Sequence, residues 1–350
     1  MASISRKLFN WETLPFAVLY APLSIFWLYY ILKTWRIWWF MPVDPTLEFS
    51  GFEGEGKKEM YQQLPKWSIP TTLFFNPKMP FAQVVAHIAN ANLNYPIITK
   101  PDKGMQGVLF RIIDTETQLK KYHTAMHDEY IVQPFIKYPI ELSVFYIRYP
   151  NQTKGKVTGF ISKEYLQVKG NGSHTLLQLI KAHPKAHLRM DEMTHKHQNN
   201  FNNIIPINET YFLSYAGNHN RGAKFINLHT QIDTNLQTLF DKISLHSKAF
   251  YYGRYDVKCQ TIADLKAGKN FSILEFNGAG AEPNHIYDCN MGLRAAYKEI
   301  LTHWAHMYAI AQINLKAGHK PWSAIKGFKF LMQAKKDFKQ FSKLDLALKI

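Results

Sequence analysis

Cysteine is scarce in this chain, and the commonest nucleotide-binding motifs are missing. Its two cysteines, Cys259 and Cys289, show no CxxC spacing, which excludes a disulfide framework and a cysteine-ligated zinc site and favours a reducing compartment such as the cytoplasm. The chain contains neither a Walker A sequence nor a GxGxxG run. P-loop and Rossmann-type nucleotide binding are therefore disfavoured.

Acidic residues are few compared with basic ones. The chain has 26 Asp and Glu against 42 Lys and Arg, a formal net charge of +16, which favours nucleotide phosphates, an acidic lipid surface or nucleic acid as a partner. Helix-turn-helix, zinc-finger and RRM-type signatures do not occur at their expected spacings, so we expect no nucleic acid partner. With 350 residues, 46% of them hydrophobic, the chain is long enough for one large or two ordinary domains.

One uncharged run stands out near the N-terminus, LPFAVLYAPLSIFWLYYIL from Leu14 to Leu32. A helix that spans a bilayer needs about 20 apolar residues. Arg6 and Lys7 precede the run, and Lys33 and Arg36 follow it within WRIWWF, a tryptophan-rich pattern typical of a headgroup interface. Residues 1–42 are therefore predicted to be a membrane segment, transmembrane or membrane-associated, and the basic residues at both ends leave its orientation open.

Two prolines interrupt this run. Pro15, Pro22 and the lack of a small-x-small cleavage site disfavour a cleaved signal peptide. The alternatives to a spanning helix are a buried core helix and an interfacial hairpin kinked at the prolines.

The rest of the chain divides by composition. Residues 43–80 are rich in Pro, Gly and charge and are predicted to be a linker, with a short remnant of a preceding region and a strand at TTLFF. Over residues 81–300, helical patterns such as FAQVVAHIANAN alternate with strand-like runs such as YIVQPFI, ELSVFYIRY and FSILEFN. This alternation predicts an α+β catalytic domain.

A histidine-rich interval, HPKAHLRMDEMTHKHQNNFNN, begins at His183 and is predicted to be a long loop or lid. His183 and His187 have the HxxxH spacing of some zinc sites, but Pro184 opposes a helix and the HExxH carboxylate is missing. Solvated loop histidines are favoured over metal ligands.

The C-terminal residues 301–350 comprise the end of an amphipathic helix and a basic tail, WSAIKGFKFLMQAKKDFKQFSKL. Its lysines interleave with Phe and Leu, a pattern suited to an anionic membrane surface. The alternative is the solvated face of a helix that packs on the protein.

The strongest local pattern for chemistry is GRYDVK followed by LEFNGAG. Residues two apart on a strand share a face, so Arg254 lies with Asp256, and Glu275 lies with Asn277. Asp256, Glu275 and Asn277 are oxygen donors of the kind that Mg²⁺ prefers, and Arg254 would clamp a transferring phosphoryl group. The alternative is a solvated strand face with a surface ion pair.

A second pattern for phosphate binding lies upstream. Lys100 ends an apolar strand and precedes a loop that contains Gly104 and Gly107. Glycines let backbone N–H groups approach phosphate oxygens, and the lysine supplies fixed positive charge.

The segment YIVQPFIKYPIELSVFYIRY follows. It is predicted to form the edge that binds adenine, with Glu141 accepting the ribose hydroxyls. The residues of the adenine edge are Gln133, Pro134, Phe135 and Ile136. Arg148 and Lys163 lie on later strands, where they would face the phosphates or simply be surface charges.

Taken in order, these residues resemble the ATP-grasp superfamily over about residues 64 to 300, and most closely the D-alanine:D-alanine ligase and cyanophycin synthetase relatives. The resemblance implies two α+β lobes that sandwich ATP. In the family the first lysine and the glycine loop cover the phosphates, the linker between the lobes binds adenine, and the RxD and ExN strands bind phosphate and two magnesium ions. Mn²⁺ is an alternative metal.

Two further segments are similar to the family. VKGNGSHTLLQLI resembles the VxGDGxHTxxxLI stretch of cyanophycin synthetase and fused glutathione-synthesis enzymes. YAGNHNRGAKF is similar to a Gly/Asn-rich stretch in the same relatives, which implies that Asn218 and Arg221 face substrate or phosphate. Gln133 departs from the glutamate common at its position, and the region before Lys100 is too short for a D-alanine-ligase substrate domain, so the acceptor site is not carried over.

By this resemblance the chain is expected to be an ATP- and Mg²⁺-dependent carboxylate–amine, or carboxylate–thiol, ligase that forms an acyl phosphate. Lys100 and Arg254 would act on the phosphoryl group, and Gly278 and Gly280 would offer N–H groups to an oxyanion. The expected partners are a small-molecule carboxylate, an amine and membrane lipid, with the catalytic domain facing the cytoplasm. An ATP-grasp kinase or phosphotransferase, or a non-catalytic nucleotide-binding membrane protein, is the alternative.

Overall fold

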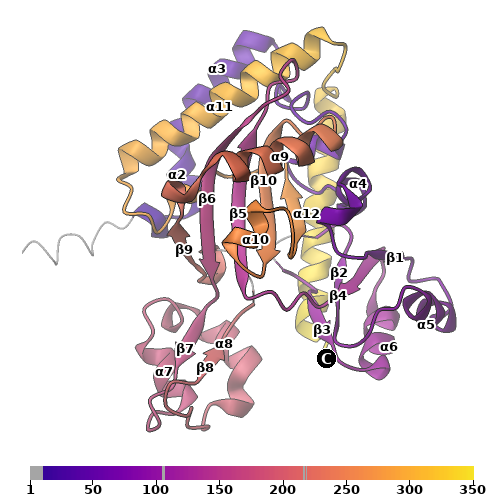
Figure 1. The fold of residues 1–350 in the computed structure, drawn as a ribbon, viewed down its shortest axis with the longest axis vertical. Helices are drawn as coiled ribbons and strands as arrows, with labels where there is room; N and C mark the ends of the chain where they lie inside the picture. The colour runs from indigo at the N-terminus through magenta and orange to yellow at the C-terminus, as the bar shows by residue number, and fades with distance from the viewer. Residues whose placement is uncertain (1–10, 105–106, 216, 218) are drawn as a thin grey trace, which may run out of the picture.

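The computed structural model of this chain describes residues 11–104, 107–215, 217 and 219–350; Arg6, Lys7 and Asn218 lie outside the described residues. Two antiparallel sheets form the centre of the molecule, and a two-stranded unit projects from the larger one (Figure 1). The predicted mixture of helices and strands is confirmed.

The larger sheet has the strand order β11-β10-β5-β6-β9. Its strands in chain order are β5 (Ile140–Ile147), β6 (Lys156–Glu164), β9 (Lys224–Asn227), β10 (Tyr252–Cys259) and β11 (Phe271–Asn277). The central strand β5 is buried at every position after Ile140, because helices cover both faces of the sheet. Helices α9 (Thr234–His246) and α10 (Ile262–Lys266) cover one face, and α11 (Leu293–Lys316) covers the other (Figure 1).

The smaller sheet has the order β1-β4-β2-β3. Its strands are β1 (Leu73–Phe75), β2 (Ile97–Pro101), β3 (Arg111–Ile113) and β4 (Tyr130–Pro134), and α5 (Phe81–Asn90) and α6 (Glu116–Ala125) pack on it. Helix α6 begins with a capping box in which Thr115 and Gln118 exchange side-chain and backbone hydrogen bonds.

The projecting unit corrects the expectation of a long loop in the histidine-rich interval. The interval contains η5 (His187–Arg189), α8 (Met190–His197) and η6 (Gln198–Asn200). These pack with α7 (Leu176–Ala182) on the antiparallel pair of β7 (Gln167–Lys169) and β8 (Thr210–Phe212), around a small core that includes Met193 and Ile180. Burial of these apolar residues stabilises the helices in spite of the polar sequence.

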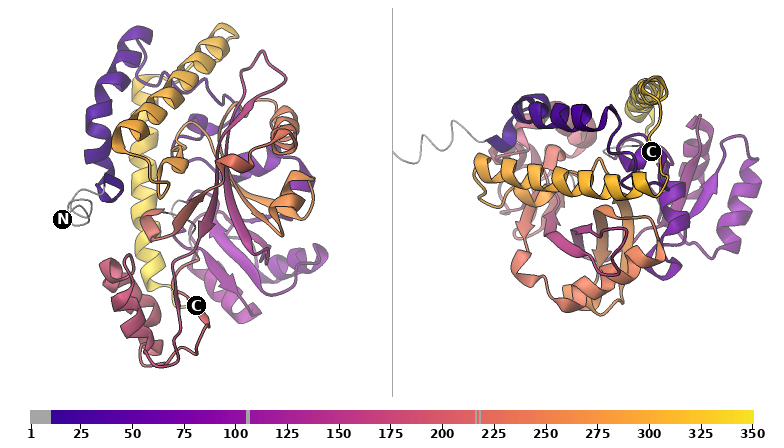
Figure 2. Two further views of the ribbon diagram at one scale, coloured as in Figure 1. Left: turned by 60° about the vertical axis from the view of Figure 1, so that its left-hand side comes forward. Right: turned by 90° about the horizontal axis from the view of Figure 1, so that it is seen from above.

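The apolar N-terminal run forms α2 (Phe16–Tyr20), η2 (Ala21–Leu23) and α3 (Ser24–Thr34), preceded by η1 (Trp11–Thr13). Within the described residues, Phe16–Thr34 is the one helical stretch long and apolar enough to cross a membrane. It runs along α11, as Figures 1 and 2 both show, with Leu19 and Leu23 buried and the ring of Tyr30 stacked 4.9 Å from that of Tyr308. Only 11% of the apolar stretch is buried, so most of its surface faces outward.

Residues 43–80 do not form the linker that their composition predicted. They contain η3 (Glu48–Gly51), α4 (Lys57–Gln63), η4 (Lys66–Ser68) and β1. Val43, Phe49, Met60 and Tyr61 are each at most 4% exposed and belong to the cores beneath the larger sheet and α11. This Pro- and Gly-rich segment is therefore part of the folded protein.

Helix α12 (Ala324–Ala347) connects distant parts of the protein. Gly327 packs on the Trp38 indole near one end, and Phe341 is buried in the core of the smaller sheet near the other. The lysines of the helix are exposed, which agrees with the solvated face of a packing helix. The remaining short helices are η7 (His219–Arg221), η8 (His229–Gln231) and η9 (Asn284–Ile286).

Candidate active site

A cavity of about 800 Å³ lies between the two sheets and extends across the larger one. It brings together residues that lie far apart in the sequence, among them these predicted site residues: Lys100, Gly104, Gly107, Gln133, Pro134, Phe135, Ile136, Glu141, Lys163, Arg221, Arg254, Asp256, Glu275, Asn277 and Gly280. Gly278 is not part of its wall. The functional roles of these residues stay predictions, but their convergence is a property of the fold.

The strands β10 and β11 present four polar side chains to one face, as the sequence pattern predicted. Arg254 pairs with Asn277 and Asp256 with Glu275 in the antiparallel register. Residues directly opposite each other on such strands point to the same side of the sheet.

Asp256 is the centre of a buried charge network. Its Oδ1 lies 2.9 Å from the Lys163 Nζ and 3.2 Å from the Arg254 Nε, and it accepts a hydrogen bond from the Ser143 hydroxyl. Burial acts to raise the pKa of Asp256, but the two cations and the hydroxyl outweigh it and hold that pKa well below its usual range. The carboxylate is therefore charged at any physiological pH.

Lys163 joins this network to Glu141. Its Nζ lies 3.2 Å from the Glu141 Oε1, and the Tyr165 hydroxyl donates to the same carboxylate. Burial lowers the pKa of Lys163, but Asp256 and Glu141 together raise it above the ordinary value. We call the part of the cavity formed by Lys100, Glu141, Lys163, Arg254 and Asp256 the charged end.

The donor set fits a magnesium ion. Asp256 and Glu275 stand opposite each other and offer carboxylate oxygens, the ligands that Mg²⁺ prefers. The Asn277 side chain lines the cavity, and its buried Nδ2 has no hydrogen-bond partner among the described residues. An acceptor such as a phosphate oxygen would satisfy this N–H donor, whereas the Oδ1 of the same side chain is the atom that could bind the metal.

Lys100 reaches the cavity from the end of β2. Its Nζ lies 3.4 Å from both the Tyr61 hydroxyl and the Leu274 carbonyl oxygen. Burial lowers the pKa of Lys100, and Glu275 and Glu141 offset this only in part. A bound anion would stabilise such a lysine, because a negatively charged phosphate favours the protonated form that burial disfavours.

The backbone around the glycine loop is held on both sides. The Lys57 Nζ donates to the Gly104 carbonyl at 2.7 Å and lies 3.6 Å from the Glu275 Oε1. Gly107 has a φ of +72°, in the left-handed region that favours glycine. Sequence analysis missed Lys57, because it lies in the segment predicted to be a linker.

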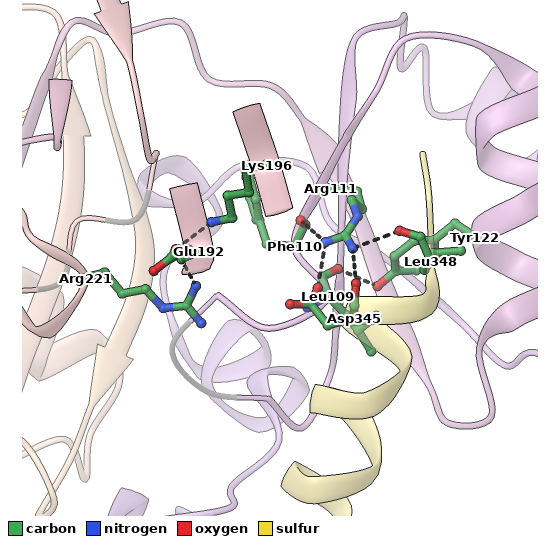
Figure 3. Close-up of polar contacts among 9 residues, drawn as sticks. All are labelled: Leu109, Phe110, Arg111, Tyr122, Glu192, Lys196, Arg221, Asp345 and Leu348. Atoms are coloured by element: carbon green, nitrogen blue, oxygen red, sulfur yellow. Dashed lines mark hydrogen bonds and ion pairs between the residues drawn. The ribbon is translucent and has the colours of Figure 1, made fainter. Parts of the chain in front are cut away.

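Beyond the loop, the chain is fastened to the end of α12 (Figure 3). The Asp345 carboxylate accepts from the Leu109 N–H at 2.9 Å and from the Arg111 guanidinium at 2.7 Å. Arg111 also donates to the Leu348 carbonyl at 3.2 Å. The C-terminal helix thereby fixes where the loop re-enters the smaller sheet.

The predicted adenine edge lines the cavity at the end of β4. The Gln133 amide is buried and donates to the Thr72 hydroxyl at 2.7 Å. The Lys258 Nζ donates to the Ile136 carbonyl at 3.2 Å, and burial lowers the pKa of that lysine. Lys258 was missed, although it shares a strand face with Arg254 and Asp256 and the alternation would have identified it.

Two expectations need correction. Arg148 does not face the cavity: its guanidinium is buried and donates to the Ser244 hydroxyl and the Lys248 carbonyl, each at 2.9 Å, so it holds the end of α9. The Gly280 N–H donates to the Gly51 carbonyl at 3.2 Å and is not free to bind an oxyanion in this conformation. Gly278 packs closely on Ser50 and Gly51.

The opposite end of the cavity has a different character. We call it the aromatic end and define it by Phe16, His219, Arg221, Glu282 and Tyr287, which all line the cavity. The His219 ring stacks on Tyr287 at 4.8 Å, and the Tyr287 hydroxyl donates to the Glu282 carboxylate at 2.7 Å.

Arg221 joins this end to the projecting unit. It lies 3.4 Å from Glu192 of α8, which also accepts from Lys196 at 2.7 Å (Figure 3). Apart from Arg221, the sequence did not identify the residues of the aromatic end.

Comparison with known proteins gives likeness at the level of solved structures. No family model and no curated protein matches the chain. A bifunctional glutathione synthetase from Pasteurella multocida is similar with 15% identity and a TM-score of 0.39 over 70% of this chain and 34% of its own length. That synthetase is an enzyme of the ATP-grasp superfamily, which the sequence motifs of this chain resemble.

Two D-alanine–D-alanine ligases of the same superfamily are also similar. The Bacillus anthracis enzyme complexed with ATP has 12% identity and a TM-score of 0.39, over 77% of this chain and 67% of that one. The Coxiella burnetii enzyme has 8% identity and a TM-score of 0.43, over 78% and 62%. This chain thus spans a third to two thirds of the length of these proteins. Likeness of this extent assigns no activity, which we infer from the cavity instead.

Proposed function

We propose that this chain is a membrane-associated, ATP- and Mg²⁺-dependent ligase of the ATP-grasp type, which joins a carboxylate to an amine or a thiol. The observation that carries the proposal is the charged end of the cavity. There the Lys163–Asp256–Arg254 network and the half-buried Lys100 face one another across the two sheets. Cations grouped in a cavity with a carboxylate pair suit a polyphosphate and its metal.

Each residue has a part in holding the nucleotide. Lys100 and Lys163 would bind phosphate oxygens, and the backbone of Pro134 to Ile136 would bind the adenine. Asp256, Glu275 and Asn277 would hold Mg²⁺, which when bound neutralises phosphate charge and fixes the polyphosphate geometry. Glu141, already hydrogen-bonded by Tyr165, would accept the ribose hydroxyls.

The proposed chemistry proceeds in two transfers. A carboxylate oxygen of the substrate attacks the γ-phosphorus, the bond to the β-phosphate oxygen breaks, and ADP leaves. The amine then attacks the acyl carbon, inorganic phosphate leaves, and the amine loses a proton. Arg254 would stabilise the charge on the transferring phosphoryl group.

The membrane part of the proposal rests on the N-terminal helices. Ile25, Phe26, Leu28 and Leu32 are between 46% and 67% exposed, although they are large and apolar. An exposed apolar surface of this kind is typical of a membrane contact. The basic side chains of Lys33 and of α12 would attract anionic lipid.

The test measures Mg²⁺-dependent ATP binding and ADP release. We expect Glu275→Gln to weaken both by roughly 10- to 100-fold, since it removes a metal-binding charge. Glu164→Gln is the matched control, because that glutamate is exposed near the end of β6 and lies outside the cavity wall. Wild-type ATP binding by Glu275→Gln would contradict the metal assignment.

The same assay separates a ligase from a kinase. Carboxylates, amino acids and dipeptides would be supplied singly and in pairs. A ligase releases ADP in sustained turnover only when carboxylate and nucleophile are both present, whereas turnover with one substrate and a stable phosphorylated product would indicate a kinase.

A further inference from the structure

The cavity does not end at the charged end but reaches the apolar N-terminal helix. The larger sheet runs from β11, beside the charged end, to β9 at its opposite edge. Phe225 of β9, Tyr287 and Phe16 line the cavity on that side. Phe16, the first residue of α2, is 67% exposed, so it belongs both to the cavity wall and to the outer surface.

Specific contacts hold α2 in this position. The Tyr20 hydroxyl donates to the Glu282 carboxylate at 2.6 Å, and the Tyr297 hydroxyl donates to the Leu19 carbonyl at 2.9 Å. Just before α2, the Trp11 indole donates to the Met291 carbonyl at 2.9 Å and stacks 5.5 Å from Tyr287. The apolar helix is therefore a part of the aromatic end and more than a separate anchor.

An apolar surface continues outward from the cavity. Phe16 stacks on Tyr20 with the ring centroids 4.2 Å apart, and Val18 of the same helix is 53% exposed. A water-soluble substrate such as a free amino acid would leave this surface without a function, whereas a hydrocarbon chain would bury it.

Two arginines where the two ends of the cavity meet suit an acidic head group, and the Glu282 carboxylate beside them already accepts from the hydroxyls of Tyr20 and Tyr287. Arg221 lines the cavity, and its contact with Glu192 is long, at 3.4 Å. Arg254 bridges the two ends, because it lies 3.2 Å from Asp256 and also donates to the Glu282 carbonyl at 3.4 Å. A carboxylate placed between these arginines would lie toward the charged end.

We propose that the carboxylate substrate is an amphiphile taken from a membrane surface, with its head between Arg221 and Arg254 and its hydrocarbon chain leaving the cavity past Phe16. This inference rests on the proposed function, because the carboxylate is the group that the ligase would activate. The N-terminal helix then has two roles: it contacts lipid, and it forms one wall of the passage from the lipid to the reacting phosphate.

The experiment compares two probes that share a head group. The full chain is titrated with N-acetylglycine and with N-lauroylglycine below its micelle concentration, by calorimetry in the presence of a non-hydrolysable MgATP analogue. Each buried methylene strengthens binding roughly fourfold, so we expect N-lauroylglycine to bind at least about 100-fold more tightly than N-acetylglycine.

Two variants show where the hydrocarbon chain of the probe binds. Phe16→Glu should reduce the preference for N-lauroylglycine to below about tenfold. Ile25→Glu is the matched control, since Ile25 is equally exposed at 67% but lies outside the cavity wall, and it should keep the wild-type preference. An equal loss in both variants would mean that the probe binds the outer helix surface, and would overturn the inference. Phe16→Ser, which adds no charge, should lower the preference in the same direction.

Binding of the MgATP analogue to the wild-type chain is measured separately. If the analogue does not bind, the proposed function fails. If it binds but the two glycine derivatives bind equally, the proposed function stands and the amphiphile is wrong.

Discussion

At the charged end of the cavity, Lys163 on β6 contacts the Asp256 carboxylate of β10 across the central strand β5, and Arg254 contacts the same carboxylate from β10 itself. The aromatic end, in contrast, is assembled from parts of the chain far apart. Phe16, His219 and Tyr287 come from an N-terminal helix and two short 3₁₀ segments or their flanks. Neighbouring strands give the first group fixed spacing, and helix packing positions the second. In the proposed function, this difference suits the charged end to nucleotide binding, which needs fixed geometry, and the aromatic end to recognition of a particular substrate.

Among these predictions, Lys163→Met at the charged end should lower the free energy of unfolding most. We expect the free energy of unfolding to fall by about 3–5 kcal/mol, because Asp256 and Glu141 would lose a cation that they contact in a buried site. Urea unfolding followed by tryptophan fluorescence measures the loss. Lys224→Met on the adjacent strand β9 is the control; its side chain is 63% exposed and lies 3.9 Å from Glu164, so the change should stay within about 0.5 kcal/mol. Similar losses in both variants would refute the special stability of the network.

Acid should lower the free energy of unfolding through the buried histidine His303. His303 of α11 and His285 of η9 lie 3.3 Å and 3.0 Å from the Glu299 carboxylate, and burial lowers the pKa of His303 from 6.5 to about 4. Below pH 6.5 the unfolded chain binds a proton at this histidine that the folded chain does not bind. The free energy of unfolding should therefore fall by roughly 3 kcal/mol between pH 6.5 and pH 4.

Urea unfolding at a series of pH values tests this expectation. His303→Leu should reduce the slope of the free energy of unfolding against pH in that window, and His319→Leu, at an exposed histidine beyond α11, should keep the wild-type slope. Arg254 and Lys163 hold the pKa of Asp256 low, so Asp256 should not titrate in this pH range. Equal slopes in wild type and His303→Leu would contradict the assignment.

Loss of the contact between the glycine loop and α12 should have the next largest effect on the free energy of unfolding. Asp345→Ala removes the acceptor of the Arg111 guanidinium and of the Leu109 N–H, and should cost about 2 kcal/mol of the free energy of unfolding. It should also weaken ATP binding several-fold, because the loop would be less ordered. Asp337→Ala on the same helix breaks only an exposed contact with Gln333 and should change stability by less than about 0.5 kcal/mol. If ATP binding is unchanged in Asp345→Ala, the contact of the loop with α12 stabilises the fold but has no part in ATP binding.

The smallest change in the free energy of unfolding is expected for a contact at the aromatic end. Tyr20→Phe removes one of two hydroxyls that donate to Glu282 and should lower the free energy of unfolding by about 1 kcal/mol. ATP affinity should stay at the wild-type value, since Tyr20 lies outside the charged end. Tyr29→Phe, at a ring that is 52% exposed, is the control for stability. Loss of ATP affinity in Tyr20→Phe would show that the two ends are coupled.

Prediction from sequence succeeded where local periodicity carries the information. Side chains two apart on a strand share a face, so Arg254 with Asp256 and Glu275 with Asn277 could be grouped before any fold was known, and Lys258 could have been added. Lys57 and Tyr165 could not be found in this way, because the contacts that give them a role cross between separate elements. Arg148 followed the correct alternation, but the helix that covers its face of the sheet made it a structural residue.

Composition was the least reliable guide. The Pro- and Gly-rich residues 43–80 and the histidine-rich interval were predicted to be linker and loop, yet both pack in cores. Burial of a few residues such as Phe49, Met60 and Met193 outweighs weak local preferences.

The sequence by itself determined the mixed α+β class, the single long apolar run and the polar strand pair with its upstream lysine and glycines, because each is a local pattern of period, length or order. Only the tertiary structure decided that the apolar run lies along α11 and reaches the cavity at Phe16, and that Glu282 joins it to Arg254. The contact between Tyr20 and Glu282 connects residues 262 positions apart. Such contacts depend on how whole elements pack, and no local pattern records them.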